Sequence, residues 1–373
     1  LKYHTTERAR QVSLDSMDIH GGKGICLGPN NYLGRGYQGS PIAITVEGAN
    51  ILTRSLIIFG QGAIRCHPYV FKELESIRNN NLVEFDKAFF AHAGFIIANF
   101  TKSVIFAWTD AHMSKAPVSS VKRYYQLVHK YSANLAFLAD FSMTVLGGNL
   151  KRKEKLSSRL GDMLSALYLT SAVLKRFHED GEPKADLPLV EWSCQQLLHE
   201  CEMAMHGVIV NFPARWARVV LRLIIKPLGN RRNKPNDQLG HKLARALIEP
   251  GETRSRLTHL VYSKASENCP LGRMEETFHK ICAADELERK VMRAVKDNVL
   301  KSLTLLEQIN EALACGLLTE AEAKQLKEAE LARQDVIKVD DFNDEDLRRA
   351  QPTKSNRSKK AVVNKDDIES EMI

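Results

Sequence analysis

Glu47 and Gly48 are the residues of this sequence whose types and spacing point most directly to chemistry. They stand in the segment Thr45–Arg54, where a carboxylate is followed at once by glycine and then by an apolar run predicted to be a helix. Glycine beside the acid lets a ligand approach the backbone closely. An apolar neighbour such as Val46 disfavours the charged carboxylate, which favours general-base chemistry near neutral pH. The alternative is an ordinary acid in the first helical turn, stabilised by the helix dipole by about 0.3–1 kcal/mol.

A glycine cluster formed by Gly21, Gly22 and Gly24 lies upstream of this acid. Free backbone N–H groups in such a cluster suit a phosphate group. The sequence Gly22-Lys23-Gly24 is not a P-loop, because no Ser or Thr follows the Gly-Lys pair. A predicted helix rather than a strand precedes the cluster, which excludes a Rossmann site. A glycine-rich turn that joins two helices remains the alternative.

Four residues have the side-chain types of a zinc site, namely Cys194, His199, Cys201 and His206. On a helix the two cysteines fall about 20° apart, and the histidines lie roughly 120–140° from Cys194. One zinc ion cannot use all four from a single helix, so we predict core cysteines, ordinary histidines and no metal. None of the seven cysteines forms a C-x-x-C pair. This predicts reduced thiols in a cytoplasmic protein.

The chain is basic, with a net charge of +8 and a pI near 9.0. Such a charge favours an acidic partner of some kind, but no nucleic-acid-binding module is recognisable, so no nucleic-acid partner is predicted. Arg215, Arg218, Arg222 and Lys226 fall within about 80° of one another on a helix. This stripe fits a helix lying on anionic lipid, a contact for an acidic partner, or a solvated face.

The remaining pattern predicts an all-α fold, because helical periodicity dominates and strand-like alternation is scarce. A glycine-rich loop is expected over 18–41, with a short helical piece at 32–37, and a helix over 48–65. Further helices are expected over 82–109, 118–145, 151–178, 187–211, 213–226, 238–248 and 274 to about 333, with one continuous helical face over 284–317. The apolar runs at 95–108 and 135–145 are shorter than the roughly 20 residues of a membrane span.

The order of these motifs resembles the end of the acyl-CoA dehydrogenase fold. The resemblance lies in the helix followed by Ile19-His20-Gly21-Gly22-Lys23-Gly24, then Tyr32-Leu33-Gly34-Arg35, then Thr45-Val46-Glu47-Gly48 and the helix that carries Arg54. The sequence is especially similar to the long bacterial members, which carry an additional helical C-terminal region to which Val70–Arg333 is similar. The resemblance therefore covers nearly the whole chain, as a C-terminal fragment.

The resemblance implies FAD-dependent conversion of fatty acyl-CoA to trans-2-enoyl-CoA, the first step of fatty-acid β-oxidation. It assigns Glu47 as the base for the α-proton, with Glu47 and Gly48 at the substrate carbonyl. Gly21, Gly22 and Gly24 would meet the FAD of a neighbouring subunit in a homo-oligomer. An electron-transferring flavoprotein would accept the electrons. Independently of the resemblance, the cysteine usage and the Arg215–Lys226 stripe predict a cytoplasmic location with a possible peripheral contact to the inner membrane.

The predicted organisation has three parts: a dehydrogenase helical domain at 1–69, an additional helical domain at 70–338, and a disordered charged tail at 339–373. In the family, an N-terminal helical domain and a β-domain that hold most of the flavin precede this region. The fragment alone is therefore expected to bind FAD poorly and to turn over no substrate. Two rival interpretations are a non-catalytic helical interaction or membrane-surface module, and an acyl-CoA oxidase.

Overall fold

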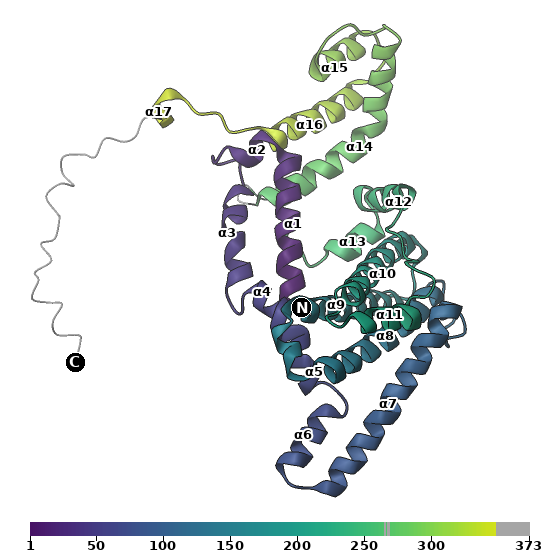
Figure 1. Cartoon of the computed structure of the whole chain (residues 1–373). Coiled ribbons are helices and arrows are strands. Elements are labelled where there is room, and N and C mark those ends of the chain that lie inside the picture. The colour runs from purple at the N-terminus through teal and green to yellow at the C-terminus, as the bar shows by residue number, and fades with distance from the viewer. Residues whose placement is uncertain (265, 267–268, 348–373) are drawn as a thin grey trace, which may run out of the picture.

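The computed structural model of the chain describes residues 1–264, 266 and 269–347. Helices account for 76% of the structure, and no strand occurs among the residues it describes. The predicted all-α fold is therefore confirmed. Figure 1 shows a central helical body, a helical hairpin below it, and two helical units above it.

The first 65 residues form a chain of helices that begins with the long helix α1. Their bounds are α1 Lys2–His20, α2 Gly22–Ile25, α3 Gly34–Thr45, α4 Asn50–Leu52, the π-helix η1 Thr53–Gln61 and α5 Gly62–Arg65. Helix α1 packs against α3, while η1 packs against the central body. Phe59 of η1 is buried in the same core as Leu156 and Leu160. The predicted boundary at residue 69 stays a prediction, but the packing is continuous across it.

A hairpin of two helices, α6 Val70–Arg78 and α7 Leu82–Thr109, leads into the central body. The central body is a bundle that consists of α8 Lys122–Leu146, the 3₁₀ helix η2 Gly147–Arg152, α9 Glu154–Glu179, the 3₁₀ helix η3 Lys184–Asp186, α10 Leu187–Val210 and α11 Arg215–Ile225. Its largest fully buried side chains include Tyr131, Leu160 and Phe212. The body thus builds the main core from η1 and helices α8 to α11.

A second, smaller core lies in the C-terminal helices. These are α12 Asp237–Ile248, α13 Glu252–Thr258, α14 Pro270–Lys296, α15 Leu305–Ala314, α16 Glu320–Ile337 and α17 Asp344–Leu347. Val291, Ile309 and Leu326 pack this core between α14, α15 and α16. The N-terminal end of α14 and the C-terminal end of α16 lie beside α2 (Figure 1).

Two local predictions are wrong. The glycine-rich segment is a loop only over 26–33, because α1, α2 and α3 occupy most of the rest of 18–41. Oδ1 of Asn31 accepts hydrogen bonds from the N–H groups of Leu33 and Gly34 at the start of α3. The continuous helix over 284–317 is broken after Lys296, and α15 starts afresh at Thr304 with a capping box. The apolar face at 284–317 therefore comes from two helices that pack around one core.

The predictions for the membrane and for the tail also change. Helix α7 has 28 residues and a window of mean hydropathy 1.4, so by length and composition it is long and apolar enough to cross a membrane. The run at 95–108 is part of this longer helix. The predicted disordered tail starts at 339, yet Asp340 is buried against the loop at Gly28. Residues 348–373 lie outside the part that the structure describes.

Candidate functional site

Glu47 lies in a tight turn between α3 and α4 rather than in a helix. Its φ is 54° and that of Gly48 is 86°, so two consecutive residues adopt the left-handed region. Helix α4 begins at Asn50 with Ala49 as its cap, two residues later than expected, so the alternative of an ordinary acid in the first helical turn does not hold. A positive φ at a glutamate is an uncommon, strained conformation of the kind that gathers at functional sites. The carboxylate is exposed in this structure.

The Glu47 turn is held from the side of α1. The Nζ atom of Lys2 donates hydrogen bonds to the carbonyl oxygen of Gly48 at 3.0 Å and to Oδ1 of Asn50 at 2.8 Å. The buried Asn50 side chain in turn donates to Thr6 and Glu7. The conformation of the turn therefore depends on contacts made 43 to 48 residues away in sequence.

The helix after the turn is fixed to the central body by Arg54. Its guanidinium binds both carboxylate oxygens of Asp162 on α9, Nε to Oδ1 at 2.8 Å and Nη2 to Oδ2 at 2.6 Å. This hydrogen bonding raises the pKa of Arg54. Burial in the same region raises the pKa of Tyr3 and lowers that of His4. Together with neighbouring side chains these residues line a cavity of about 500 Å³, and Glu47 is not among its lining residues.

The glycine cluster does not present the amides that a phosphate would need. The N–H of Gly21 donates to Met17 O, and that of Gly24 donates to Gly21 O. Gly24 is buried, and a Cβ there would lie 3.3 Å from the backbone oxygen and Sδ of Met17. Close packing against α1 therefore explains the glycine at this position. The prediction that the cluster offers free N–H groups is wrong at Gly21 and Gly24.

The loop after the cluster does bind an anionic group. The N–H groups of Gly28 and Asn30 donate to the two carboxylate oxygens of Asp340, at 3.1 and 2.8 Å. A Cβ at Gly28 would lie 2.3 Å from Cγ of Asp340, so only glycine fits. This pair was not predicted from the sequence. The Gly28-Pro29-Asn30 turn was the available signal, but its partner lies more than 300 residues away.

Lys23 lies beneath α16 near this loop. Its Nζ donates to the backbone oxygen of Val336, and burial together with the charge of Arg273 lowers its pKa. Helix α16 and the segment that follows it thus cover the glycine-rich region on one side.

A separate polar cluster joins the α6–α7 hairpin to the body. His92 Nδ1 lies 2.8 Å from Glu73 Oε1, and its Nε2 lies 3.4 Å from Asp140 Oδ1. His67 Nε2 lies 2.9 Å from the same Asp140 oxygen. His67 Nδ1 accepts hydrogen bonds from the backbone N–H groups of Tyr69 and Val70, which fixes the ring with Nε2 toward Asp140. This cluster, which was not predicted from the sequence, joins the hairpin to the body. Among the residues that the structure describes, His67 Nε2 and Asp140 Oδ2 have no partner with hydrogen-bond geometry, and the ligand atoms of His67, His92 and Asp140 lie within 4.8 Å of one another, close enough to hold a metal ion.

The four residues with the side-chain types of a zinc site, Cys194, His199, Cys201 and His206, lie on different faces of α10. Cys194 and Cys201 are fully buried in two hydrophobic clusters. Burial raises the pKa of Cys194 to about 12 and raises that of Cys201 as well. His199 Nδ1 contacts the backbone oxygen of Arg232 at 2.8 Å. The prediction of core cysteines is confirmed, and all seven cysteines are free.

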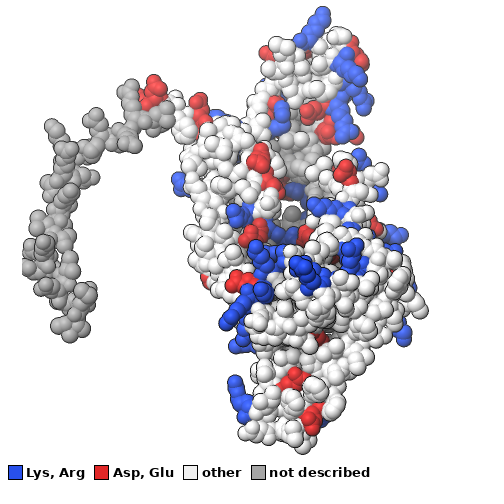
Figure 2. Space-filling view, in the orientation of Figure 1, with Lys and Arg blue, Asp and Glu red and all other residues white. Residues whose placement is uncertain are grey.

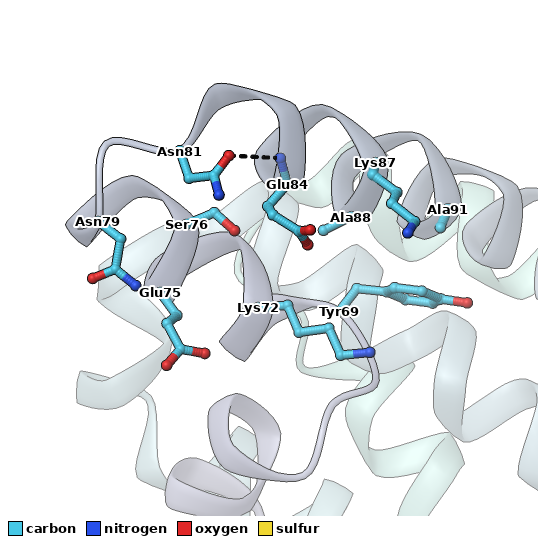
Figure 3. A pocket seen from close by; sticks show the side chains of 10 residues that line it. All are labelled: Tyr69, Lys72, Glu75, Ser76, Asn79, Asn81, Glu84, Lys87, Ala88 and Ala91. Atoms are coloured by element: carbon cyan, nitrogen blue, oxygen red, sulfur yellow. Dashed lines mark hydrogen bonds between the residues drawn. The ribbon is translucent and has the colours of Figure 1, made fainter.

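A cavity of about 430 Å³ lies between α6 and α7, on the hairpin and away from the Glu47 turn. Figure 3 shows Lys72 and Lys87 approaching Tyr69 from the two helices, with Glu84 at the start of α7. Asn81 caps that helix by accepting the N–H of Glu84 at 3.1 Å.

Comparison with known protein families assigns the chain to one of them. Residues 64–342 match the family described as acyl-CoA dehydrogenase, C-terminal, bacterial type. This match covers more than half of the chain, and the protein belongs to that family. No solved structure matches the chain. The family typically binds FAD, generally forms oligomers and uses acyl-CoA substrates.

Proposed function

We propose that this chain is the C-terminal part of an FAD-dependent acyl-CoA dehydrogenase of fatty-acid β-oxidation. The observation that carries the proposal is the strained Glu47-Gly48 turn, which lies upstream of the segment that matches the family. Glu47 takes the α-proton of a fatty acyl-CoA thioester, which yields a trans-2-enoyl-CoA. Family membership supports the class of enzyme, and the turn supports the residue.

The geometry of the turn supports this role in two ways. The left-handed backbone and the absence of a side chain at Gly48 leave one side of the carboxylate open to a flat thioester. The contacts of Lys2 and Asn50 fix the turn, so the base is positioned before substrate arrives. The backbone N–H of Glu47 would stabilise charge that develops on the thioester oxygen.

FAD would supply the redox chemistry when bound. Of the glycine-rich region, the Gly28 and Asn30 amides fit an anionic part of that cofactor best, because they hold the Asp340 carboxylate in this structure. Gly21, Gly22 and Gly24 would shape the loop by close packing rather than by donating hydrogen bonds.

We also propose the oligomeric state, the electron acceptor and the location of the enzyme, the first two by analogy with the family. The enzyme acts as a homo-oligomer, passes electrons to an electron-transferring flavoprotein, and is cytoplasmic with a peripheral contact to the inner membrane. An oxidase would instead reoxidise its flavin with oxygen, and oxygen consumption during turnover distinguishes the two.

Replacement of the base tests the proposal. In the intact, FAD-loaded protein, Glu47→Gln is expected to lower the rate of α-proton exchange and turnover by at least 1000-fold while flavin stays bound. Glu286→Gln, at an exposed glutamate on α14, is the matched control and should leave turnover unchanged. Turnover that persists in Glu47→Gln would rule out Glu47 as the base.

A further inference from the structure

Helix α7 reverses the usual pattern of a surface helix. Its buried positions are small or polar, namely Ala88, Asn99, Ser103 and Ala107. Large apolar side chains face outward instead: Phe90 is 71% exposed, Ile97 64% and Trp108 62%. At 3.6 residues per turn these three fall within about 20° of one another, so they form one continuous stripe. Only 11% of the most apolar window of α7 is buried.

The neighbouring helix α6 extends this apolar surface. Phe71, Leu74 and Ile77 of α6 are each about half exposed. The two helices pack together as a hairpin whose tip projects below the main body, while the other end of α7 packs against α8 and α11 (Figure 1). In Figure 2 this lower part of the molecule is mostly uncharged, with small charged patches near its tip. An exposed apolar surface of this extent marks an interaction site.

Helix α11 packs against α7 and adds a second exposed face. Its inner positions Ala217, Leu221 and Ile225 are buried. Exposed Trp216, Val219 and Leu223 lie on the opposite side of the helix, and the arginines lie between this apolar face and the buried one. Trp216 is 57% exposed and contacts Phe141 of the body, which fixes its position.

The charges on the α11 side of this surface have one sign, whereas the hairpin tip carries the exposed acids Glu75, Glu84 and Asp86. Between Glu202 and Asp237 the sequence contains no acidic residue and seven basic ones. Arg215, Arg218 and Arg222 of this stretch are exposed on α11. Lys226, the fourth member of the predicted stripe, is buried, so the stripe has three arginines. Helix α7 likewise has no acidic residue between Asp86 and its end at Thr109.

We infer that the α6–α7 hairpin and α11 form a docking surface for an anionic lipid bilayer. Apolar side chains of α6, α7 and α11 enter the acyl boundary, while the arginines of α11 contact lipid phosphates. Helix α7 packs against α6, α8 and α11, so it lies along the membrane interface rather than across the bilayer. Trp108 and Trp216 take the headgroup level, where indole rings are favoured.

This inference rests on the proposed membrane contact but not on the proposed chemistry. A second copy of the chain and the upstream part of the proposed enzyme are the other occupants that an apolar surface could have. The arginines of α11 favour lipid, because the stretch between Glu202 and Asp237 has seven basic residues and no acidic one, which suits lipid phosphates.

Vesicle flotation tests the inference with the full chain. We expect the protein to float with vesicles of phosphatidylethanolamine and phosphatidylglycerol and to bind neutral phosphatidylcholine vesicles much more weakly. Emission from Trp108 and Trp216 should shift to shorter wavelength on binding, and brominated lipid should quench it. An absence of flotation with either composition would overturn both the surface and the proposed membrane contact, while leaving the test of Glu47 untouched.

Two pairs of variants locate the surface. Phe90→Gln with Ile97→Gln should lower vesicle affinity at least tenfold, because both side chains are exposed and lie on the same stripe. Tyr168→Gln with Leu331→Gln is the matched control on α9 and α16, where exposed apolar residues lie outside the surface. Equal flotation of the two pairs would assign membrane binding elsewhere on the protein and overturn the inference.

A second pair of double variants tests whether the arginines of α11 contribute to binding of anionic vesicles. Arg215→Gln with Arg222→Gln should weaken binding to anionic vesicles by about 30-fold and leave binding to neutral vesicles unchanged. Lys242→Gln with Lys327→Gln removes the same charge from exposed positions on α12 and α16 and should have little effect. If light scattering instead shows a dimer that Phe90→Gln with Ile97→Gln dissociates, and no lipid binding, the surface belongs to a second copy.

Discussion

Arg54 and Asp162 form a two-point contact between the segment that follows Glu47 and the central body. Both bonds are short, at 2.8 and 2.6 Å, and the residues are 108 positions apart in sequence. A planar guanidinium that meets both oxygens of one carboxylate fixes orientation as well as distance. The position of η1, and through it of the Glu47 turn, therefore depends on α9.

Loss of this contact should cost measurable stability. Asp162→Asn is expected to lower the free energy of unfolding by about 1 kcal/mol, since the pair is partly exposed and solvent screens it. Asp285→Asn is the matched control, because Asp285 also lies 2.6 Å from an arginine, Arg289, but within one exposed helix. That variant should cost less than about 0.5 kcal/mol. Equal effects of the two substitutions in urea unfolding would contradict an anchoring role for Arg54.

Gly28 should tolerate no side chain while Asp340 occupies its loop. Gly28→Ala places a Cβ 2.3 Å from Cγ of Asp340 and should cost about 1–3 kcal/mol in the free energy of unfolding. In a background of Asp340→Gly this cost should largely disappear, because the clashing side chain is gone. Gly36→Ala in α3, where a Cβ meets nothing within 4 Å, should be neutral or stabilising. A cost that is the same with and without Asp340 would place the strain elsewhere.

Much of the fold could be predicted because long helices carry their own signals. The predicted helix at 82–109 coincides with α7, and that at 187–211 ends one residue beyond α10. The break at Lys296 was missed although Thr304 and Glu307 form a capping box that is visible in the sequence. The apolar periodicity continued across the break and outweighed that local signal.

The candidate site was only partly predictable. The type and order of residues identified Glu47 and Gly48, but the left-handed turn depends on Lys2 and Asn50 and cannot be read from local spacing. The glycine cluster suggested free amides, whereas packing on α1 uses those of Gly21 and Gly24. Contacts between segments that are distant in sequence determine both the conformation of the Glu47 turn and the hydrogen bonding of the glycine cluster.

Acid should loosen the C-terminal core through its capping glutamates. Bonds from the backbone N–H and hydroxyl of Thr319 hold the pKa of Glu322 below its usual range, and bonds from Ser302 and Lys301 do the same for Glu311. A lowered folded-state pKa contributes stability that is present above the unfolded pKa and is lost as pH falls through the folded value. Amide exchange in α14–α16 should therefore accelerate below about pH 4.

A charge-neutral variant checks the source of this pH dependence. Glu322→Gln should reduce the acid-induced acceleration at the start of α16, because its side chain no longer titrates. Glu286→Gln, exposed on α14, serves as the control and should retain the full effect. An unchanged profile in Glu322→Gln would mean that other carboxylates control acid unfolding of this core.

The left-handed backbone at Gly48 should be the feature of the turn that is most sensitive to substitution. A Cβ at Gly48 would meet only Thr53 Oγ1, at an ordinary 3.6 Å, so the cost of Gly48→Ala arises from its φ of 86°. We expect a loss of about 1 kcal/mol in the free energy of unfolding. Gly48→Asn should cost less, because asparagine tolerates the left-handed region better than alanine.

The same variants connect the turn to catalysis. In the intact, FAD-loaded protein, Gly48→Ala should lower kcat because the adjacent Glu47 carboxylate moves from its position. Gly62→Ala, in a helix where a Cβ meets nothing within 4 Å, should leave both stability and kcat close to those of the unaltered protein. If Gly48→Ala loses stability but keeps full kcat, the strained turn serves the fold alone, and the base has to be sought on another element.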